Sequence, residues 1–258
     1  MSADTQNKIA YMQEGGTKLG VILGQLLHAA QPGVSLIEVE KLAQRLIKEA
    51  EGEASFQTVK DYQWATCLCV NDVVVHGIPT DYQLKKGDIL TIDVGILYQG
   101  FHTDTAWTKI VRSQKQDKQN EKERFLKIGE EALWSAIDVA RVGNRVGHIS
   151  QVIQRIVQGA GYGIVRTLVG HGVGRELHEE PQIPGILKTS IESTPELVPD
   201  MTIAIEVIYA MGSGAVVYAN DDGWSIASRD GSLTAVFEHS VVVTRDRPMV
   251  LTRTRDMR

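Results

Sequence analysis

The sequence predicts an α+β domain of two similar halves, with an antiparallel sheet covered by helices on one face. Helical apolar spacing and strand-like apolar runs occur in the order helix, helix, strands, and this order appears twice in the 258 residues. Segments 39–50 and 149–160 also align at an offset of 110 residues, with Gln, Arg and Ala at shared positions. Amphipathic helices resemble one another through their common period, so a chance likeness is the alternative to an internal duplication.

The expected elements follow in order along the chain. A helix is predicted over about residues 6–30, and a capping box from Ser35 to Glu38 begins a second helix that extends to about residue 51. Strand-like runs cover about 65–77, 88–99 and 100–111. The second half predicts helices at about 120–140 and 147–160, then strands at about 161–170, 201–212, 215–220, 224–228 and 234–244. No low-complexity linker divides the chain, so we expect one domain, 1–258, with halves of about 1–113 and 114–258, a continuous sheet, and ligands between the halves.

Composition and charge narrow the function classes. The net charge of -5 predicts no specific nucleic-acid partner. Cys67 and Cys69, the two cysteines, are too few for a structural zinc site and are expected to be small buried side chains in a reducing compartment. The first residues lack the pattern of a signal peptide, and no apolar run has the length of a membrane span. These features predict a cytoplasmic protein without a membrane partner.

Two aspartates interrupt a predicted hairpin. If Gln99 and Gly100 form its turn, Asp93 faces Ala106 and Asp104 faces Gly95. The aspartates then become diagonal neighbours on one face, with backbones roughly 7–8 Å apart. Two carboxylates that close repel each other unless one is protonated or a cation lies between them.

Further candidate ligands come from the second half and from a strand end. Glu206 in "TIAIE" occupies the strand position that Asp93 has in "LTID", and Glu238 interrupts another apolar run. His171 and His178 lie among glycines in "GHGVGRELH", and His76 follows a strand. Each alone is compatible with an exposed acid or an ordinary histidine. Together, four carboxylates and one histidine form an oxygen-rich set that suits two divalent cations and a water activated between them.

The motifs "NDVVVHGIP", "TIDVGILYQGFHTDTA", "GHGVGRELHEEP", "TIAIE" and "FEHSVVVT" resemble those of type I methionine aminopeptidases over about residues 9–244. The resemblance implies the pita-bread fold, with a curved antiparallel sheet, and removal of the N-terminal methionine from nascent proteins and peptides, with a small second residue favoured. It implies two divalent ions (Mn, Fe, Co or Zn). By resemblance, the ligands are Asp93 on one ion, Asp104 and Glu238 bridging both, and His171 and Glu206 on the other.

The resemblance also implies roles around the ions. His178 would contact the scissile carbonyl, His76 the scissile amide or nearby substrate backbone, and Glu206 would shuttle the proton. The implied pocket residues are Tyr62, Cys67, Leu177 and Trp224. The chain departs from the usual family pattern at Val207, where proline is usual, at Leu177, where an aromatic residue is common, and within residues 55–67. A monomer, associated with the ribosome in the cell, is the further expectation.

Alternatives remain beside this interpretation. One is a related pita-bread aminopeptidase with altered first-residue specificity, and another is a non-catalytic binding protein of the same fold. A related peptidase acting on X-Pro bonds is disfavoured, because such enzymes usually lack the "HEEP" motif that begins here at His178. Serine hydrolase chemistry has no support, because no G-x-S-x-G motif is present. Among the other histidines, His102 shares the strand face of Asp104 and could support the site, His239 alternates away from Glu238, and His148 is expected at a helix surface or cap.

Overall fold

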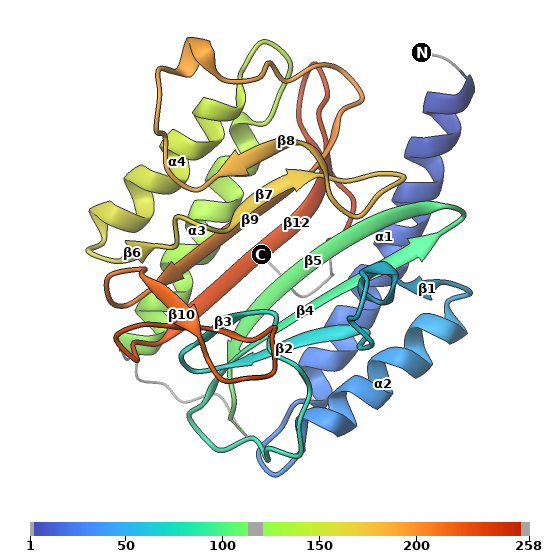
Figure 1. The fold of residues 1–258 in the computed structure, drawn as a ribbon. Coiled ribbons are helices and arrows are strands. Elements are labelled where there is room, and N and C mark those ends of the chain that lie inside the picture. Colours follow the sequence, from blue (N-terminus) through green and yellow to red (C-terminus); the bar gives the residue numbers. More distant parts are fainter. Residues whose placement is uncertain (1–2, 113–120, 254–258) are drawn as a thin grey trace.

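The computed structural model describes residues 3–112 and 121–253, in which helices lie behind an array of antiparallel strands (Figure 1). The helices are α1 (Ala3–Ala29), α2 (Leu36–Glu49), α3 (Glu121–Val139) and α4 (Val146–Gly159), with short 3-10 turns η1 (Ser55–Thr58) and η2 (Ile191–Ser193). The first-half strands are β1 (Glu53–Ala54), β2 (Thr66–Val70), β3 (Val73–Val75), β4 (Ile89–Tyr98) and β5 (Phe101–Ile110). The second-half strands are β6 (Gly163–Ile164), β7 (Val169–Gly172), β8 (Glu179–Pro184), β9 (Thr202–Ala210), β10 (Val216–Tyr218), β11 (Ile226–Ser228), β12 (Thr234–Val242) and β13 (Met249–Val250).

The central strands are buried on both faces, as their apolar runs predict. In β4, Ile92 and Val94 are fully buried in the main core, which they share with residues of all four helices. Asp93 lies between them and therefore points to the opposite face. The same alternation in β9 buries Ile205 and Val207 toward the helices and turns Glu206 the other way. The helices thus cover one face of the strands, and the acidic side chains belong to the other.

The predicted hairpin register is confirmed. Strands β4 and β5 pair Asp93 with Ala106 and Asp104 with Gly95, and Gln99 and Gly100 both have positive φ in the turn between them. A two-residue turn with this backbone matches the twist of the strands it joins and leaves one register. The aspartates are therefore diagonal neighbours on one face, as expected.

The two halves meet where β5 runs beside β12 (Figure 1), and side-chain hydroxyls join these strands. The Ser240 hydroxyl accepts from the Asp104 N–H (2.8 Å) and donates to the Asp104 carbonyl (2.8 Å). The Thr108 hydroxyl donates to the Val236 carbonyl (2.7 Å) and accepts from its N–H (2.9 Å). Among the described residues, no main-chain ladder joins β5 to β12, so the sheet that was expected to be continuous is interrupted at this junction.

Equivalent elements recur at the predicted offset. Helices α2 and α4 each have 14 residues, and their first residues, Leu36 and Val146, are 110 apart. Strands β1 and β6 follow the two helices at the same offset and pair with β4 and β9. The capping box from Ser35 to Glu38 is present, and His148 caps α4 by accepting from the Arg145 N–H (3.0 Å). These correspondences support the predicted division into two halves, which stays a prediction.

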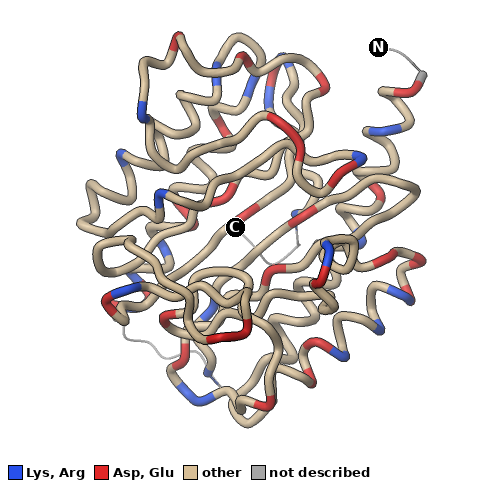
Figure 2. The backbone as a smooth tube through the Cα atoms, viewed as in Figure 1, with Lys and Arg blue, Asp and Glu red and all other residues tan. Residues whose placement is uncertain are grey.

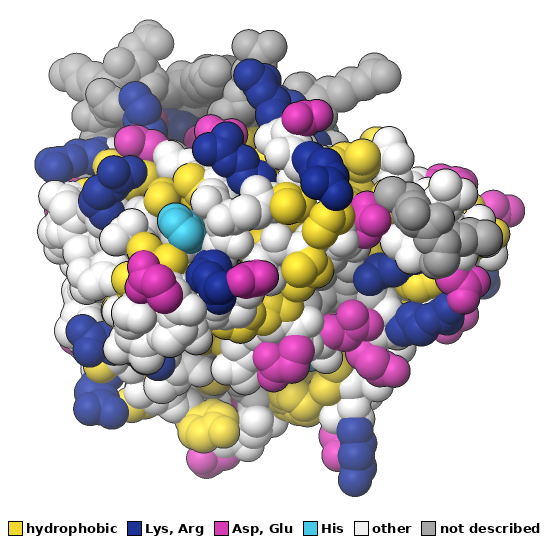
Figure 3. Space-filling view, turned by 90° about the horizontal axis from the view of Figure 1, so that it is seen from above, with side chains coloured by type: hydrophobic (Ala, Val, Ile, Leu, Met, Phe, Trp, Pro, Cys, Tyr) yellow, Lys and Arg dark blue, Asp and Glu magenta, His cyan; other side chains and the backbone are white. Residues whose placement is uncertain are grey.

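Several strands differ from the prediction. The run expected at 65–77 divides into β2 and β3, the run expected at 161–170 divides into β6 and the start of β7, and β1, β8 and β13 were not predicted. Among the described residues, no helix combines the length and apolar character needed to cross a membrane. The face seen in Figure 3 carries charges of both signs among scattered hydrophobic side chains, so its described residues form no continuous basic stripe.

Candidate metal centre and substrate pocket

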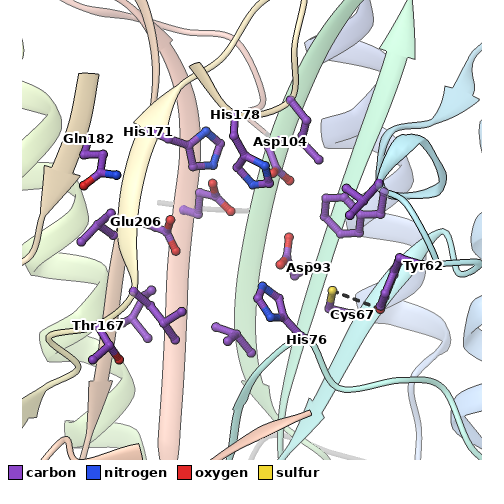
Figure 4. Close-up of a pocket in the computed structure, with 18 of the residues that line it drawn as sticks. Tyr62, Cys67, His76, Asp93, Asp104, Thr167, His171, His178, Gln182 and Glu206 are labelled. Carbon is purple, nitrogen blue, oxygen red and sulfur yellow. Dashed lines mark hydrogen bonds between the residues drawn. The ribbon is translucent and has the colours of Figure 1, made fainter. Parts of the chain in front are cut away.

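A cavity of about 550 Å³ opens between the two halves, on the strand face opposite the helices. Its lining contains every site residue that the sequence predicted: Tyr62, Cys67, His76, Asp93, Asp104, His171, Leu177, His178, Glu206, Trp224 and Glu238. Figure 2 shows acidic positions on the central strands, and Figure 4 shows how the labelled side chains converge on the cavity. Residues far apart in the sequence are therefore brought to one site.

Four strands place the four carboxylates. Asp93 and Asp104 come from β4 and β5, and Glu206 and Glu238 from β9 and β12. Glu206 and Glu238 occupy directly opposite positions in the β9–β12 register. Ligand atoms of Asp104, Glu238 and His171 all lie within 4.8 Å of one another. That spacing suits coordination of a shared cation.

Among the described residues that line the cavity, none offers the carboxylates a compensating positive charge from a Lys or Arg side chain. Burial raises the pKa of Asp104 to about 7 and, with the Asp104 charge, that of Glu206 to about 8. Burial and the neighbouring carboxylates also raise the pKa of Asp93 and of Glu238 well above the usual range. Protons or cations must therefore neutralise this set.

One carboxylate oxygen without a hydrogen-bond partner indicates that the four carboxylates and His171 suit divalent metal ions. Asp93 Oδ1 is buried and has no hydrogen-bond partner in the part of the chain that the structure describes. An orphaned carboxylate oxygen is costly in a folded protein unless a ligand satisfies it. Carboxylate oxygens with an imidazole nitrogen match the ligand preferences of divalent first-row metals. Cys67 and Cys69 are free and buried, and two cysteines are too few for a structural zinc site of thiolates. The residues fit divalent metal ions.

The histidines are neutral and oriented. His171 Nδ1 lies 2.9 Å from the Gly172 carbonyl oxygen, which can only accept, so Nδ1 carries the proton and Nε2 is free to ligate. Burial lowers the pKa of His171 to about 4. The His178 ring lies 4.5 Å from the His171 ring, centroid to centroid, at 69°. His76 has a φ of 55°, an uncommon backbone conformation for a residue that lines a site.

Aromatic and sulfur-containing side chains form an apolar wall beside the carboxylates. Phe56, Tyr62, Cys67 and Leu177 form one buried cluster, with Trp224 packed against it. The Tyr62 ring meets the Trp224 ring edge to face at 5.0 Å between centroids. The Tyr62 hydroxyl donates to the Thr66 carbonyl (2.8 Å) and lies 3.2 Å from Cys67 Sγ. Burial raises the pKa of the Cys67 thiol, which is therefore a neutral part of the wall.

Sequence reasoning missed other lining residues. They lie next to named motifs or share strand parity with them: Val75, Thr167, Leu168, Val169, Glu179, Glu180, Gln182 and Ile208. Ile208 could have been found, because it lies two residues after Glu206 on the same strand face. His102 is buried near the site, but its Nδ1 lies 2.9 Å from the Ser55 hydroxyl and it is not a lining residue.

Two packed α+β halves with carboxylates and histidines between them, among them the buried Asp104, His171 and Glu238, define the class of metal-dependent hydrolases. The sequence model of metallopeptidase family M24 matches residues 10–245, so the chain belongs to this family. Curated relatives include a methionine aminopeptidase of Clostridium perfringens, 36% identical over 96% of both chains. Methionine aminopeptidase 1 of Bacillus subtilis is 35% identical, covering 96% of this chain and 98% of its own length.

Solved structures show the same fold. The methionine aminopeptidase of Thermotoga maritima matches with a TM-score of 0.90 and 36% identity, covering 96% of this chain and 97% of its own. The prolidase of Pyrococcus furiosus matches with a TM-score of 0.75 over 96% of this chain and 64% of its own, at 23% identity, which shows likeness of fold alone. The predicted pita-bread fold is confirmed.

Proposed function

We propose that this metal-dependent aminopeptidase removes methionine from the N-terminus of peptides and nascent proteins, and favours a small second residue. The observation that carries the proposal is that one cavity contains both a cluster of metal-ligand side chains and an apolar wall beside it. Four carboxylates, of which Asp104 and Glu238 are buried and the other two partly buried, adjoin with His171 an apolar wall of Tyr62, Cys67, Leu177 and Trp224. The names of the relatives support methionine as the first residue.

The proposed centre holds two divalent ions, with Mn, Fe, Co and Zn all compatible with its donors. Asp93 would bind one ion, Asp104 and Glu238 both, and His171 and Glu206 the other. Ligand atoms of Asp104, Glu238 and His171 lie within 4.8 Å of one another, which supports a shared cation for these three residues. When bound, the ions neutralise the carboxylates and lower the pKa of water so that it can attack a peptide carbonyl.

The remaining roles fall to side chains of this chain. Glu206 takes a proton from the attacking water and delivers it to the leaving amine. His178 donates a hydrogen bond to the scissile carbonyl oxygen as negative charge develops there. His76, held by its backbone conformation, contacts the substrate main chain at the scissile amide.

The apolar wall provides selectivity for the first side chain. Methionine is unbranched, and its thioether makes favourable contacts with aromatic rings. Tyr62 and Trp224 present such rings, and Leu177 fills the position where the family often has an aromatic residue. A methionine side chain inserted between them would lose water contact while its amino group lies toward the carboxylates.

Reconstitution with single metals, followed by a peptide panel, tests the proposal. Metal-stripped protein is loaded with Mn, Fe, Co or Zn, and kcat/KM is measured for peptides that differ only in their first two residues. Met-Ala and Met-Gly peptides should be cleaved fastest. Turnover of Leu-first or Phe-first peptides at equal rates would favour the alternative of altered specificity, and failure to bind any of these metals in calorimetry would favour a non-catalytic protein. The monomeric state and ribosome association stay predictions.

A further inference from the structure

The loop before β11 is built around one carboxylate, that of Asp222. Its Oδ1 accepts from the N–H groups of Trp224 and Ser225, both at 2.7 Å, and its Oδ2 accepts from the Ser225 hydroxyl at 2.6 Å. The Ala219 N–H donates to the Ser225 carbonyl (2.8 Å) and closes the loop. Three hydrogen bonds on one carboxylate fix the backbone on which the Trp224 ring is carried.

The same loop lies at the strand end that carries His76. Strands β3 and β11 pair antiparallel, with Val75 opposite Ile226. His76 follows β3 and Ser225 precedes β11, so these two residues lie at the same end of the ribbon. The Ser225 hydroxyl, which donates to Asp222, also accepts a longer bond from the Ile78 N–H at 3.4 Å. Asp222 is thus linked through Ser225 to the segment that holds His76 in its positive φ.

We propose that Asp222 is a positioning residue that sets both the Trp224 side of the first-residue pocket and the His76 segment. This inference rests on the proposed function and deepens it. Asp222 is not among the cavity-lining residues, whereas Trp224 and His76 both are. It therefore acts through the loop and not by contact with substrate.

The local electrostatics agree with an anchor that stays ionised. Slight burial would raise the pKa of Asp222, but hydrogen bonds from Ser225 and Trp224 outweigh it and lower the pKa below its usual value. A carboxylate is a stronger acceptor than a neutral amide. The three donors are thus held at any pH at which the enzyme is expected to work.

Two nearby aspartates provide matched controls. Asp230 lies two residues after the end of β11 and also accepts N–H groups, from Ser213 (2.9 Å) and Ser232 (3.1 Å), but it is not a lining residue of the cavity. Asp221 is the exposed neighbour of Asp222 in the loop and makes none of the three Asp222 bonds. Asp230→Ala controls for loss of a loop anchor, and Asp221→Ala controls for loss of one negative charge near the site.

Steady-state kinetics on the metal-loaded full chain test the role. Asp222→Ala should lower kcat/KM for a Met-first peptide by about tenfold or more, since small misplacements of positioning groups have large effects. KM should rise and discrimination between Met-first and Leu-first peptides should fall, because the Trp224 wall is displaced. Ser225→Ala keeps the main-chain bonds to Asp222 and should lower kcat more than it raises KM. Asp222→Asn, which keeps an acceptor oxygen, should recover activity to within about threefold of the wild type.

Hydrogen exchange gives a readout that needs neither metal nor substrate. The Trp224 and Ser225 amides should exchange about tenfold faster in Asp222→Ala and should be unchanged in the Asp221 and Asp230 variants. Unchanged exchange, or kinetics and selectivity equal to those of the controls, would overturn the positioning role. A wild-type chain that fails to select methionine would overturn the proposed function and the specificity part of this inference, while the exchange result would still report on the anchor.

Discussion

Glu206 and Glu238 lie directly opposite each other on β9 and β12, and both face a cavity lined by no Lys or Arg. Like charges at facing positions of an antiparallel pair are destabilising, and burial increases the cost. A bound divalent ion relieves this repulsion. The same two residues therefore connect the stability of the protein to occupancy of its proposed metal centre.

Replacement of Glu238 should separate the repulsion within the Glu206–Glu238 pair from the stabilisation by bound metal. Glu238→Gln is isosteric and removes an ionisable carboxyl, so folding at pH 8 no longer has to bury a charge or take up a proton at this position. The metal-free protein should therefore gain about 1 kcal/mol in the free energy of unfolding. The variant should also lose peptidase activity and most of the stabilisation that added metal gives the wild type. Urea unfolding with chelator and with metal measures both effects.

The exposed Glu192 offers a control with the same change in net charge. Glu192→Gln should alter neither the metal-free stability nor the response to metal by more than about 0.5 kcal/mol. If Glu238→Gln destabilised the metal-free protein and still responded fully to metal, the proposed bridging role would be wrong.

The metal-free protein should lose stability as the pH rises from about 6.5 to 8. The pKa values of Asp104 and Glu206, about 7 and about 8, lie above their usual range, so the folded state holds protons that the unfolded chain has released. The buried histidines act in the opposite direction, since the pKa of His171 is lowered to about 4. Their stabilisation is complete above about pH 6.5 and is lost only as the pH falls below it. Above about pH 6.5, the carboxylates therefore determine how the free energy of unfolding changes with pH, and it should fall as the pH rises.

Each excess proton on the folded state contributes a slope of about 1.4 kcal/mol per pH unit. Urea unfolding at pH 6.5, 7.25 and 8.0 in chelator should show this decline, and saturating metal should abolish it because metal binds the ionised carboxylates. A flat or rising profile in chelator would show that the carboxylates are already ionised in the folded state.

The sequence carried enough information to predict the site and most of the fold. Asp93 and Asp104 could be placed because a two-residue turn and a period of two leave one register for their hairpin. The apolar runs around Asp93 and Glu206 predict strands that are buried on both faces, so an acidic residue inside such a run indicated a functional site. Their convergence with His171 depends on how the halves pack. The apparent duplication predicts only that ligands lie between the halves, and the family resemblance supplied the individual ligands.

The missed features lack local signals. The β8 segment "EEPQIP" is acidic and contains two prolines, which strands usually exclude, but β8 is at the end of its sheet, where proline is tolerated. The β5–β12 junction depends on hydroxyls of Thr108 and Ser240, whose partners are more than 100 residues away. Val207, where the family usually has proline, lies in the interior strand β9, a position that suits a β-branched residue.

His171 and His178 should respond differently to substitution although their rings are 4.5 Å apart. His178→Ala should lower kcat by about 100-fold, the usual effect of removing a donor to a developing oxyanion, and should keep metal affinity. His171→Ala should lose metal. Calorimetric metal titration beside steady-state kinetics distinguishes them, and a His178→Ala protein that no longer binds metal would remove His178 from its proposed role.

Glu40 should stabilise the pocket from outside it. Its side chain on α2 is 1% exposed, and it accepts from the Ala65 N–H (2.8 Å), the Thr66 N–H (3.0 Å) and the Thr66 hydroxyl (2.5 Å). The Thr66 carbonyl in turn accepts from the Tyr62 hydroxyl. Glu40→Gln places an NH₂ group against these donors, so it should cost about 1–3 kcal/mol in the free energy of unfolding. KM for Met-first peptides should rise as the Tyr62 wall loosens.

Glu49, near the end of the same helix, provides the comparison, because its side chain is 62% exposed and its contact with Arg45 spans 3.8 Å. Glu49→Gln should change stability by less than about 0.5 kcal/mol and leave KM unaltered. Thermal and urea unfolding of both variants, with KM measured on one Met-first peptide, test whether Glu40 supports both the fold and the pocket. Equal behaviour of the two variants would mean that the Glu40 bonds do not hold β2 and Tyr62 in place. A loss of stability without a rise in KM would limit Glu40 to supporting the fold.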